Sequence, residues 1–204
     1  GINLWAALDA TVAFNTLFHS QEEAQSNIVI NSYRHLDAPG SPIAACKNIS
    51  VVGNIFQKSS TAYGTNGGGF GAAMLHIRDG GLVGTEMPLM SHNVYHAASP
   101  TEASDAYATF LDERSLSMNA DSVFFGGLES WTAHCDCDEG SVDGNPLLQS
   151  DFSVAPCSPA AFMSLSGLLG RFPIDFHGHS RIATSDHMVI AGAVSSDSAS
   201  GGKS

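Results

Sequence analysis

Positive charge is scarce in this chain. Eight lysine and arginine residues stand against twenty aspartate and glutamate residues, so the formal net charge of the 204 residues at pH 7 is −12. A surface of that sign repels phosphate backbones, and we expect no nucleic acid partner. The lysines, Lys47, Lys58 and Lys203, form no polybasic cluster that could hold an anionic membrane surface. Apolar runs are short as well: none approaches the roughly 20 residues of a membrane helix, so no membrane span is expected.

Complete catalytic motifs are missing too. The sequence has no G-x-S-x-G segment, which holds the nucleophile of α/β-hydrolases. The glycine cluster at 66–69 lacks both the Lys-Ser/Thr of a P-loop and the GxGxxG spacing of a dinucleotide site. These absences count against an ordinary enzyme.

The composition predicts a globular protein. Hydrophobic residues make up 43% of the chain and charged residues 14%, so it can bury enough apolar surface to fold. At this length one domain is the simplest expectation. We expect a single globular domain over residues 1–196, without an internal repeat, followed by a polar Gly/Ser tail at 197–204.

The predicted elements are short strands with one or two helices. Ser99 and Glu102 form an S-x-x-E capping box with Pro100 at the first helical position, which predicts a helix over 99–114. Apolar residues one helical turn apart favour another helix over 3–25, with two strands as the alternative. Strands are expected at 27–36, 43–46, 49–56, 70–77 (in a hairpin with 82–83), 122–125, 128–134, 152–154 and 188–194, and 159–169 stays ambiguous between helix and strand. The fold class is therefore expected to be α+β and β-rich: a mostly antiparallel sheet or sandwich with one or two packed helices.

Residues 171–187 concentrate metal-binding side chains. On an extended backbone, Asp175, His177 and His179 point to the same face, where they could hold a transition metal such as zinc. In that interpretation His187 or Glu129 is the general base that acts on a metal-bound water. The alternative is a set of ordinary polar residues on the wet face of a half-buried strand.

His92 and His96 could add ligands to this site. They are four residues apart, so they would share one face of a helix. The segment is short and lacks helical patterning, however, which favours the alternative of histidines satisfied by backbone groups.

The acidic loop at 135–146 is a second candidate site. Its carboxylates are oxygen ligands of the kind that calcium prefers: Asp136, Asp138, Glu139 and Asp143. Their spacing does not match an EF-hand, because Ser141 and Leu147 occupy the positions of the required glycine and glutamate. A solvated acidic turn is the simpler interpretation.

The four cysteines, Cys46, Cys135, Cys137 and Cys157, could form two disulfides. A bridge between Cys135 and Cys137 would be strained at a spacing of two residues, so we expect each of them to reach Cys46 or Cys157.

Several features favour an extracellular or secreted protein. Asn48-Ile49-Ser50 is a glycosylation sequon, with Asn48 as the candidate site, and the cysteine number is even. The chain begins at Gly1 without a signal-like segment, which we expect of a processed mature protein. A cytosolic chain with four free thiols is the alternative.

Two functional hypotheses follow. The first is a non-catalytic extracellular structural or assembly subunit of the filament, coat or adhesin type, which associates with itself or with another extracellular protein. This hypothesis is supported by the small share of charged residues, the abundance of small residues and the lack of a catalytic motif. The second is a secreted metal-dependent hydrolase that uses the His/Asp site at 175–187.

Elemental analysis tests the metal hypothesis. Protein purified without chelator should carry about one equivalent of zinc or a similar metal, as a three-ligand site predicts. A His177→Ala, His179→Ala double variant should lose it. Metal-free protein, with unchanged folding in the variant, would rule the site out.

Overall fold

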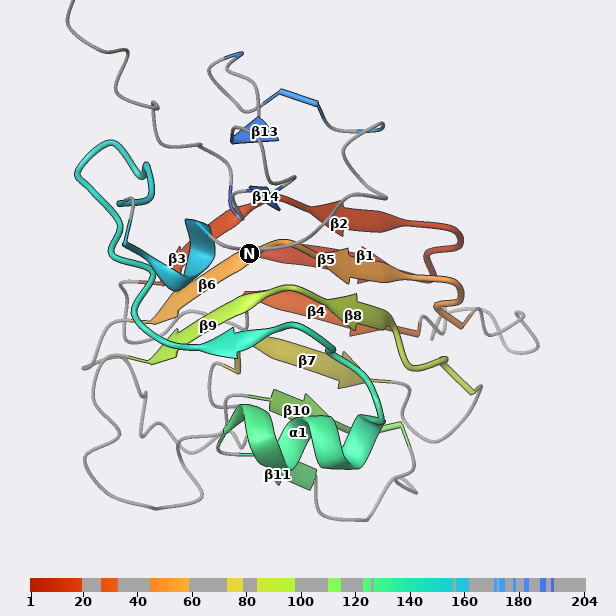
Figure 1. The fold of residues 1–204 in the computed structure, drawn as a ribbon. Coiled ribbons are helices and arrows are strands. Elements are labelled where there is room, and N and C mark those ends of the chain that lie inside the picture. The colour runs from red at the N-terminus through yellow and green to blue at the C-terminus, as the bar shows by residue number, and fades with distance from the viewer. Residues whose placement is uncertain are drawn as a thin grey trace, which may run out of the picture.

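The computed structural model of the chain describes residues 1–19, 27–32, 45–58, 73–78, 84–97, 110–114, 123–125, 127–155, 157–161, 171, 173–174, 178, 182–183, 188–189 and 192. Within these residues the backbone winds through three successive coils, each of which contributes one strand to each of three sheets (Figure 1). The first coil consists of β1 (Ile2–Trp5), β2 (Thr11–Ala13) and β3 (Thr16–His19). The second consists of β4 (Ile28–Asn31), β5 (Ser50–Val52) and β6 (Ile55–Lys58). The third consists of β7 (Leu75–Arg78), β8 (Leu89–Ser91) and β9 (Val94–Ala97).

The chain then closes the far end of this stack. The closing elements are β10 (Phe110–Asp112), β11 (Val123–Phe125), α1 (Leu128–Cys135) and β12 (Val142–Asp143). The remaining described elements are a 3₁₀ turn (Pro159–Ala161), β13 (Ile182–Ala183) and β14 (Met188–Val189). No helix among the described residues is long and apolar enough to cross a membrane.

All strand pairs between successive coils are parallel, so the architecture is a parallel β-solenoid. The sheets have the orders β1-β4-β7-β10-β11, β2-β5-β8 and β12-β9-β6-β3. Among the strand pairs of the described residues, β10–β11 and β13–β14 are antiparallel, as is the isolated bridge between Leu148 and Val154. The expectation of a mostly antiparallel sheet or sandwich is therefore wrong. Short alternating strands do not reveal their pairing, because the strands β1–β9 bond to strands one coil away rather than to their neighbours in sequence.

The expectation of no internal repeat is also wrong. In the β2–β3 region, Val12 pairs with Val51, and Val51 pairs with Met90. Each step is 39 residues, and β3, β6 and β9 follow the same step. The repeat is hard to see in the sequence because the rest of the coil varies in length: Ile28 follows its partner Ile2 by 26 residues, and Leu75 follows Ile28 by 47.

Both predicted helices need correction. Residues 3–25 form strands where they are described, as in the alternative, because inward and outward side chains alternate: along β1, Ile2 and Leu4 are partly buried, and Asn3 and Trp5 are exposed. The helix predicted over 99–114 covers residues 99–109, which lie outside the described part, and β10, which is a strand. Conversely, the strand predicted over 128–134 is α1. Leu128, Trp131 and Cys135 recur at a helical period and pack against the end of the core.

The other predicted strands are confirmed in part. β4, β11 and β14 lie within their predicted ranges, and β7 ends one residue beyond 70–77. The range 49–56 divides around Gly53 into β5 and the start of β6. The segment 152–154 contributes a single bridge between Leu148 and Val154. Residues 43–44 and 162–170, the 79–83 turn of the predicted hairpin and the tail from 193 onward lie outside the described residues.

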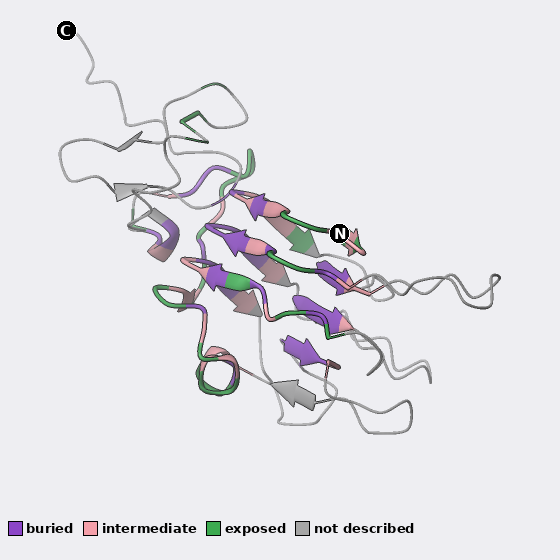
Figure 2. Cartoon of the chain, turned by 90° about the vertical axis from the view of Figure 1, so that its right-hand side faces the viewer, coloured by how far each residue is buried: buried purple, intermediate pink, exposed green. Residues whose placement is uncertain are grey.

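The core is an aromatic stack that runs along the coil axis. Phe56 stacks on Tyr95 at 5.0 Å between ring centroids, and Tyr95 meets Phe110 edge-on at 4.8 Å. Phe110 stacks on Trp131 of α1 at 4.9 Å. All four side chains are buried, as the burial colours of Figure 2 show for the strands of the stack. The helix therefore covers the end of the core with the last ring of the stack.

An asparagine ladder fixes the corner between the second and third sheets. The Nδ2 of Asn15 donates to the Oδ1 of Asn54 at 3.0 Å, and the Nδ2 of Asn54 donates to the Oδ1 of Asn93 at 3.2 Å. The Nδ2 of Asn93 then donates to the Oδ1 of Asp138 at 3.2 Å. Because a carboxylate only accepts hydrogen bonds, Asp138 ends the ladder.

Replacing Asn54 with alanine tests the ladder. Its side chain accepts two hydrogen bonds from Asn15 and donates to the carbonyl of Val12 and to Asn93. At about 1 kcal/mol each, their loss should lower the free energy of unfolding by about 2–4 kcal/mol in urea denaturation.

Asn3→Ala is the matched control, because Asn3 is exposed on β1. It should change stability by less than about 0.5 kcal/mol. Equal effects of the two substitutions would contradict a role for the ladder.

Candidate functional site

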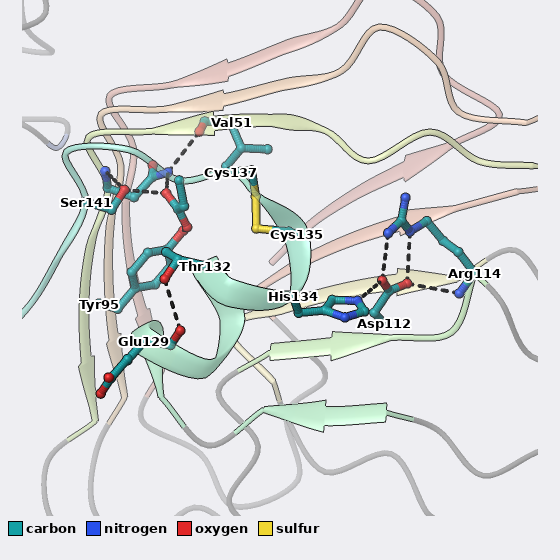
Figure 3. The surroundings of a disulfide bond; sticks show 12 residues. Val51, Tyr95, Asp112, Arg114, Glu129, Thr132, His134, Cys135, Cys137 and Ser141 are labelled. Carbon is teal, nitrogen blue, oxygen red and sulfur yellow. Dashed lines mark hydrogen bonds and ion pairs between the residues drawn. A yellow bond between two sulfur atoms is a disulfide. The ribbon is translucent and has the colours of Figure 1, made fainter.

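Charged side chains gather at the closed end of the solenoid, around α1 (Figure 3). Asp112 stands in a column of inward-facing residues, since β10 pairs it with Ile77, which pairs with Ile30 and through it with Leu4. The carboxylate is only 4% exposed. A buried charge at the end of an apolar column requires partners, and two residues supply them.

Arg114 and His134 hold this carboxylate. The guanidinium of Arg114 donates through Nε to Oδ1 at 3.0 Å and through Nη2 to Oδ2 at 2.8 Å. The Nε2 of His134, on α1, lies 2.9 Å from Oδ2. Burial raises the pKa of Asp112, but the hydrogen bonds from Arg114 and His134 and the charge of Arg114 outweigh it and leave the pKa below its usual range.

Glu113 makes a second cluster on the other face of the sheet. Successive residues of a strand point to opposite faces, so Glu113 faces away from Asp112. One of its carboxylate oxygens lies 3.1 Å from the Nε2 of His76 and 3.0 Å from the Nε of Arg78. The end of β10 thus carries two acidic residues that are each bound by a histidine and an arginine.

Asp138 is buried beneath α1. Its carboxylate accepts from Asn93, from the hydroxyl of Tyr95 at 2.8 Å and from the hydroxyl of Ser141. Burial raises the pKa of Asp138, although hydrogen bonds from Ser141, Tyr95, Asn93 and Trp131 oppose the shift. Burial, together with the charge of Asp138, also raises the pKa of Tyr95 well above its usual range.

The disulfide joins Cys135 at the end of α1 to Cys137, with a Cα–Cα distance of 5.1 Å. This corrects the expectation that each would reach Cys46 or Cys157. Cys46 is fully buried, with its sulfur near the carbonyl of Asn31, and Cys157 is exposed and free. The bridge is compatible with its short spacing because Asp136 between the cysteines adopts a left-handed conformation with φ of 50°.

The predicted calcium ligands do not converge. The side chain of Asp138 is taken up by three donors of the chain, whereas Asp136, Glu139 and Asp143 are exposed. Among the described residues, no group of three or more His, Cys, Asp or Glu side chains is placed to hold a metal ion. The calcium site stays a prediction without structural support.

The predicted transition-metal site falls largely outside the described residues. Asp175, His177, His179 and His187 are among those not described. His92 lies in the turn between β8 and β9 with φ of 54°, and His96 lies in β9, so their segment is not helical. Glu129 is exposed in the first turn of α1. Of this set, the described residues His92, His96 and Glu129 belong to no group that could hold a metal ion.

The sequon asparagine lies in an exposed turn. Asn48 has a φ of 52°, a left-handed conformation that asparagine tolerates, and its Nδ2 donates to the Oδ1 of Asp9 at 2.6 Å. Its glycosylation stays a prediction.

The chain matches no family model, no curated protein and no solved structure. Its chemistry must therefore be argued from geometry. An imidazole oriented by a carboxylate, as in His134 and Asp112, is the pair that general bases use. Here, however, Arg114 contacts both oxygens of Asp112, and the cluster neutralises a charge at the end of the core. The arrangement favours stabilisation of the closed end.

Sequence reasoning missed Asp112, Glu113 and Arg114. Their signal is a charged triplet directly after the apolar pair Phe110 and Leu111, which is how a core-facing strand ends at a polar cap. The expected helix over this segment hid that signal.

The two buried aspartates predict opposite pH effects. Because the pKa of Asp112 in the folded protein lies below 3.8, its stabilising contribution is present above pH 3.8 and is lost as the pH falls through the lower, folded value. Asp138 has a raised pKa in the folded protein. Its ionisation therefore lowers the free energy of unfolding as the pH rises from 3.8 through that higher pKa.

Urea unfolding of Asp112→Asn and Asp138→Asn across this range tests the assignment. The wild type should have a higher free energy of unfolding than Asp112→Asn, and this difference should grow with rising pH to about 1–3 kcal/mol near neutrality. The free energy of unfolding of the wild type relative to that of Asp138→Asn should fall as the pH rises. Parallel pH profiles for the two variants would contradict the assignment.

Proposed function

We propose that this chain is a non-catalytic structural or assembly subunit of the extracellular filament, coat or adhesin type. The observation that carries the proposal is the incomplete burial of the first coil. Ile2, Leu4 and Leu17 face the core but are only partly buried. Ile28, Ile30 and Phe56, their partners in the second coil, are fully buried.

The first coil also carries exposed apolar side chains. Trp5 is 57% exposed, Leu8 63% and Phe18 47%. Single exposed apolar residues are common on soluble proteins, but here they accompany an open core on the same coil.

Strand edges add to this surface. Within the described residues, β1, β2 and β3 are each the last strand of their sheet. An unpaired strand edge is a template for another strand, and solenoids usually need a cap where the stack ends. Partly buried core residues, exposed apolar side chains and strands that end their sheets within the described residues together support association through the first coil.

Sedimentation velocity over a series of protein concentrations tests the proposal. The wild-type protein should form a larger species as concentration rises, since association follows mass action. Leu8→Lys places a charge in the contact, so it should weaken association by roughly tenfold or more.

Leu89→Lys is the matched control. Leu89 is also a leucine and is 67% exposed, but it lies on β8 in the third coil. This variant should associate like the wild type. A wild type that stays monomeric throughout, or equal effects of the two lysines, would overturn the proposal.

A further inference from the structure

The disulfide between Cys135 and Cys137 closes a very short loop. The two cysteines are separated only by Asp136, and their Cα atoms lie 5.1 Å apart. In the chain-entropy account, a disulfide stabilises a fold by restricting the unfolded chain, and this effect falls as the loop becomes shorter. A bridge of this span therefore contributes less to the stability of the fold than a bridge from either cysteine to Cys46 or Cys157 would.

The helix before the disulfide is held by contacts of its own. Trp131 of α1 is fully buried and stacks on Phe110 at 4.9 Å between ring centroids. The Nε2 of His134, the residue before Cys135, lies 2.9 Å from a carboxylate oxygen of Asp112 (Figure 3). These contacts do not involve the cysteine sulfurs, so α1 should stay in place when the disulfide is reduced.

The segment after the disulfide is held as well. The carboxylate of Asp138 accepts hydrogen bonds from Asn93 and Tyr95, and the N–H of Asp138 donates to the carbonyl of Met90 at 3.0 Å. The next residue, Glu139, forms a bridge to the end of β8. Reduction of the disulfide would leave all of these contacts in place.

The backbone turn between the cysteines is set by the end of α1. Asp136 is the C-terminal cap of the helix, with φ of 50°, and its N–H donates to the carbonyl of Thr132 at 3.0 Å. A left-handed residue at this position is a common way for a helix to end. The capped turn would keep Cys135 and Cys137 close in the reduced protein, which raises the effective concentration of each thiol at the other.

The disulfide is also open to reagents in solution. Cys135 and Cys137 are only partly buried, at the margin of the hydrophobic core, and Asp136 between them is exposed. Cys46, by contrast, is fully buried. Exposed disulfides are the labile, regulatory or catalytic ones, whereas structural disulfides resist reduction by the glutathione pool. Partial exposure and a small share in the stability of the fold together favour a reversible bridge.

We propose that Cys135 and Cys137 are a redox-active pair that exchanges with thiols, an activity beyond the proposed function. A thiolate of the reductant attacks one sulfur of the bridge, forms a mixed disulfide and releases the other cysteine as a thiolate. A second reductant thiol then attacks the reductant sulfur of the mixed disulfide and releases the second cysteine. The protein gains two electrons and two protons, and the two reductant thiols become a disulfide.

Thiol trapping on the folded full chain tests this activity. The protein is incubated with about 5 mM reduced glutathione and no denaturant, then alkylated, and the labelled cysteines are located by mass spectrometry. Cys135 and Cys137 should become labelled together, whereas the buried Cys46 should not. Oxidised glutathione should restore the bridge. Circular dichroism and tryptophan fluorescence should be the same in both states, because α1 keeps its contacts.

Two variants serve as controls. Cys157→Ser removes the exposed free thiol, which could otherwise exchange with the bridge. Its bridge should be reduced and restored as in the wild type. The double variant Cys135→Ser, Cys137→Ser cannot form the bridge, so its midpoint of urea unfolding should match that of the reduced wild type and should not respond to glutathione.

Three results would overturn the proposal. The first is a bridge that resists glutathione until urea unfolds the chain, which is the behaviour of a structural disulfide. The second is loss of α1 on reduction. The third is a purified protein whose cysteines are all free and which oxidised glutathione does not convert to the Cys135–Cys137 disulfide. None of these results depends on the association state, so each leaves the proposed function to its own test.

Discussion

The hydrogen-bonded register between successive coils is the constraint on which the rest of this structure depends. Asn15, Asn54 and Asn93 bind one another through their side chains at steps of 39 residues, and each step also fixes a backbone corner. Side-chain amides inside a core are costly unless every donor and acceptor is satisfied. A slip by one residue would break the ladder and turn each strand inside out, so the ladder specifies the stacking.

The closed end combines this register with the aromatic core. Trp131 ends the stack of rings and Asp138 ends the ladder of amides, and both belong to the segment from α1 to β12. The disulfide ties the end of α1 to the strand-bound loop that carries Asp138. Asp112 is held from the other side by Arg114 and His134. The buried carboxylates Asp112 and Asp138 are therefore hydrogen-bonded parts of this end of the solenoid.

The difference between the two ends has consequences for assembly. A solenoid buries each coil against its neighbours, so a coil with one neighbour keeps part of its core exposed. At the far end, the last coil is covered by α1 and the antiparallel strand β11, and Arg114 and His134 bind the buried Asp112. The first coil, within the described residues, has partly exposed core residues instead. The proposed association through the first coil would bury these partly exposed core residues.

The sequence by itself determined the β-rich character, the scarcity of helices and the positions of several strands, because alternation and turn residues are local properties. It also placed Asp138 in an acidic loop and Cys135 beside Cys137. It could not determine parallel pairing, the identity of α1, or the distant partners of Asp112 and Asp138, which are His134, Asn93 and Tyr95 and lie 22 to 45 residues away. Only the tertiary structure decided these. The 39-residue spacing of Asn15, Asn54 and Asn93 is present in the sequence. It can be recognised as a contact only in the tertiary structure, because coils of unequal length stack to bring these residues together.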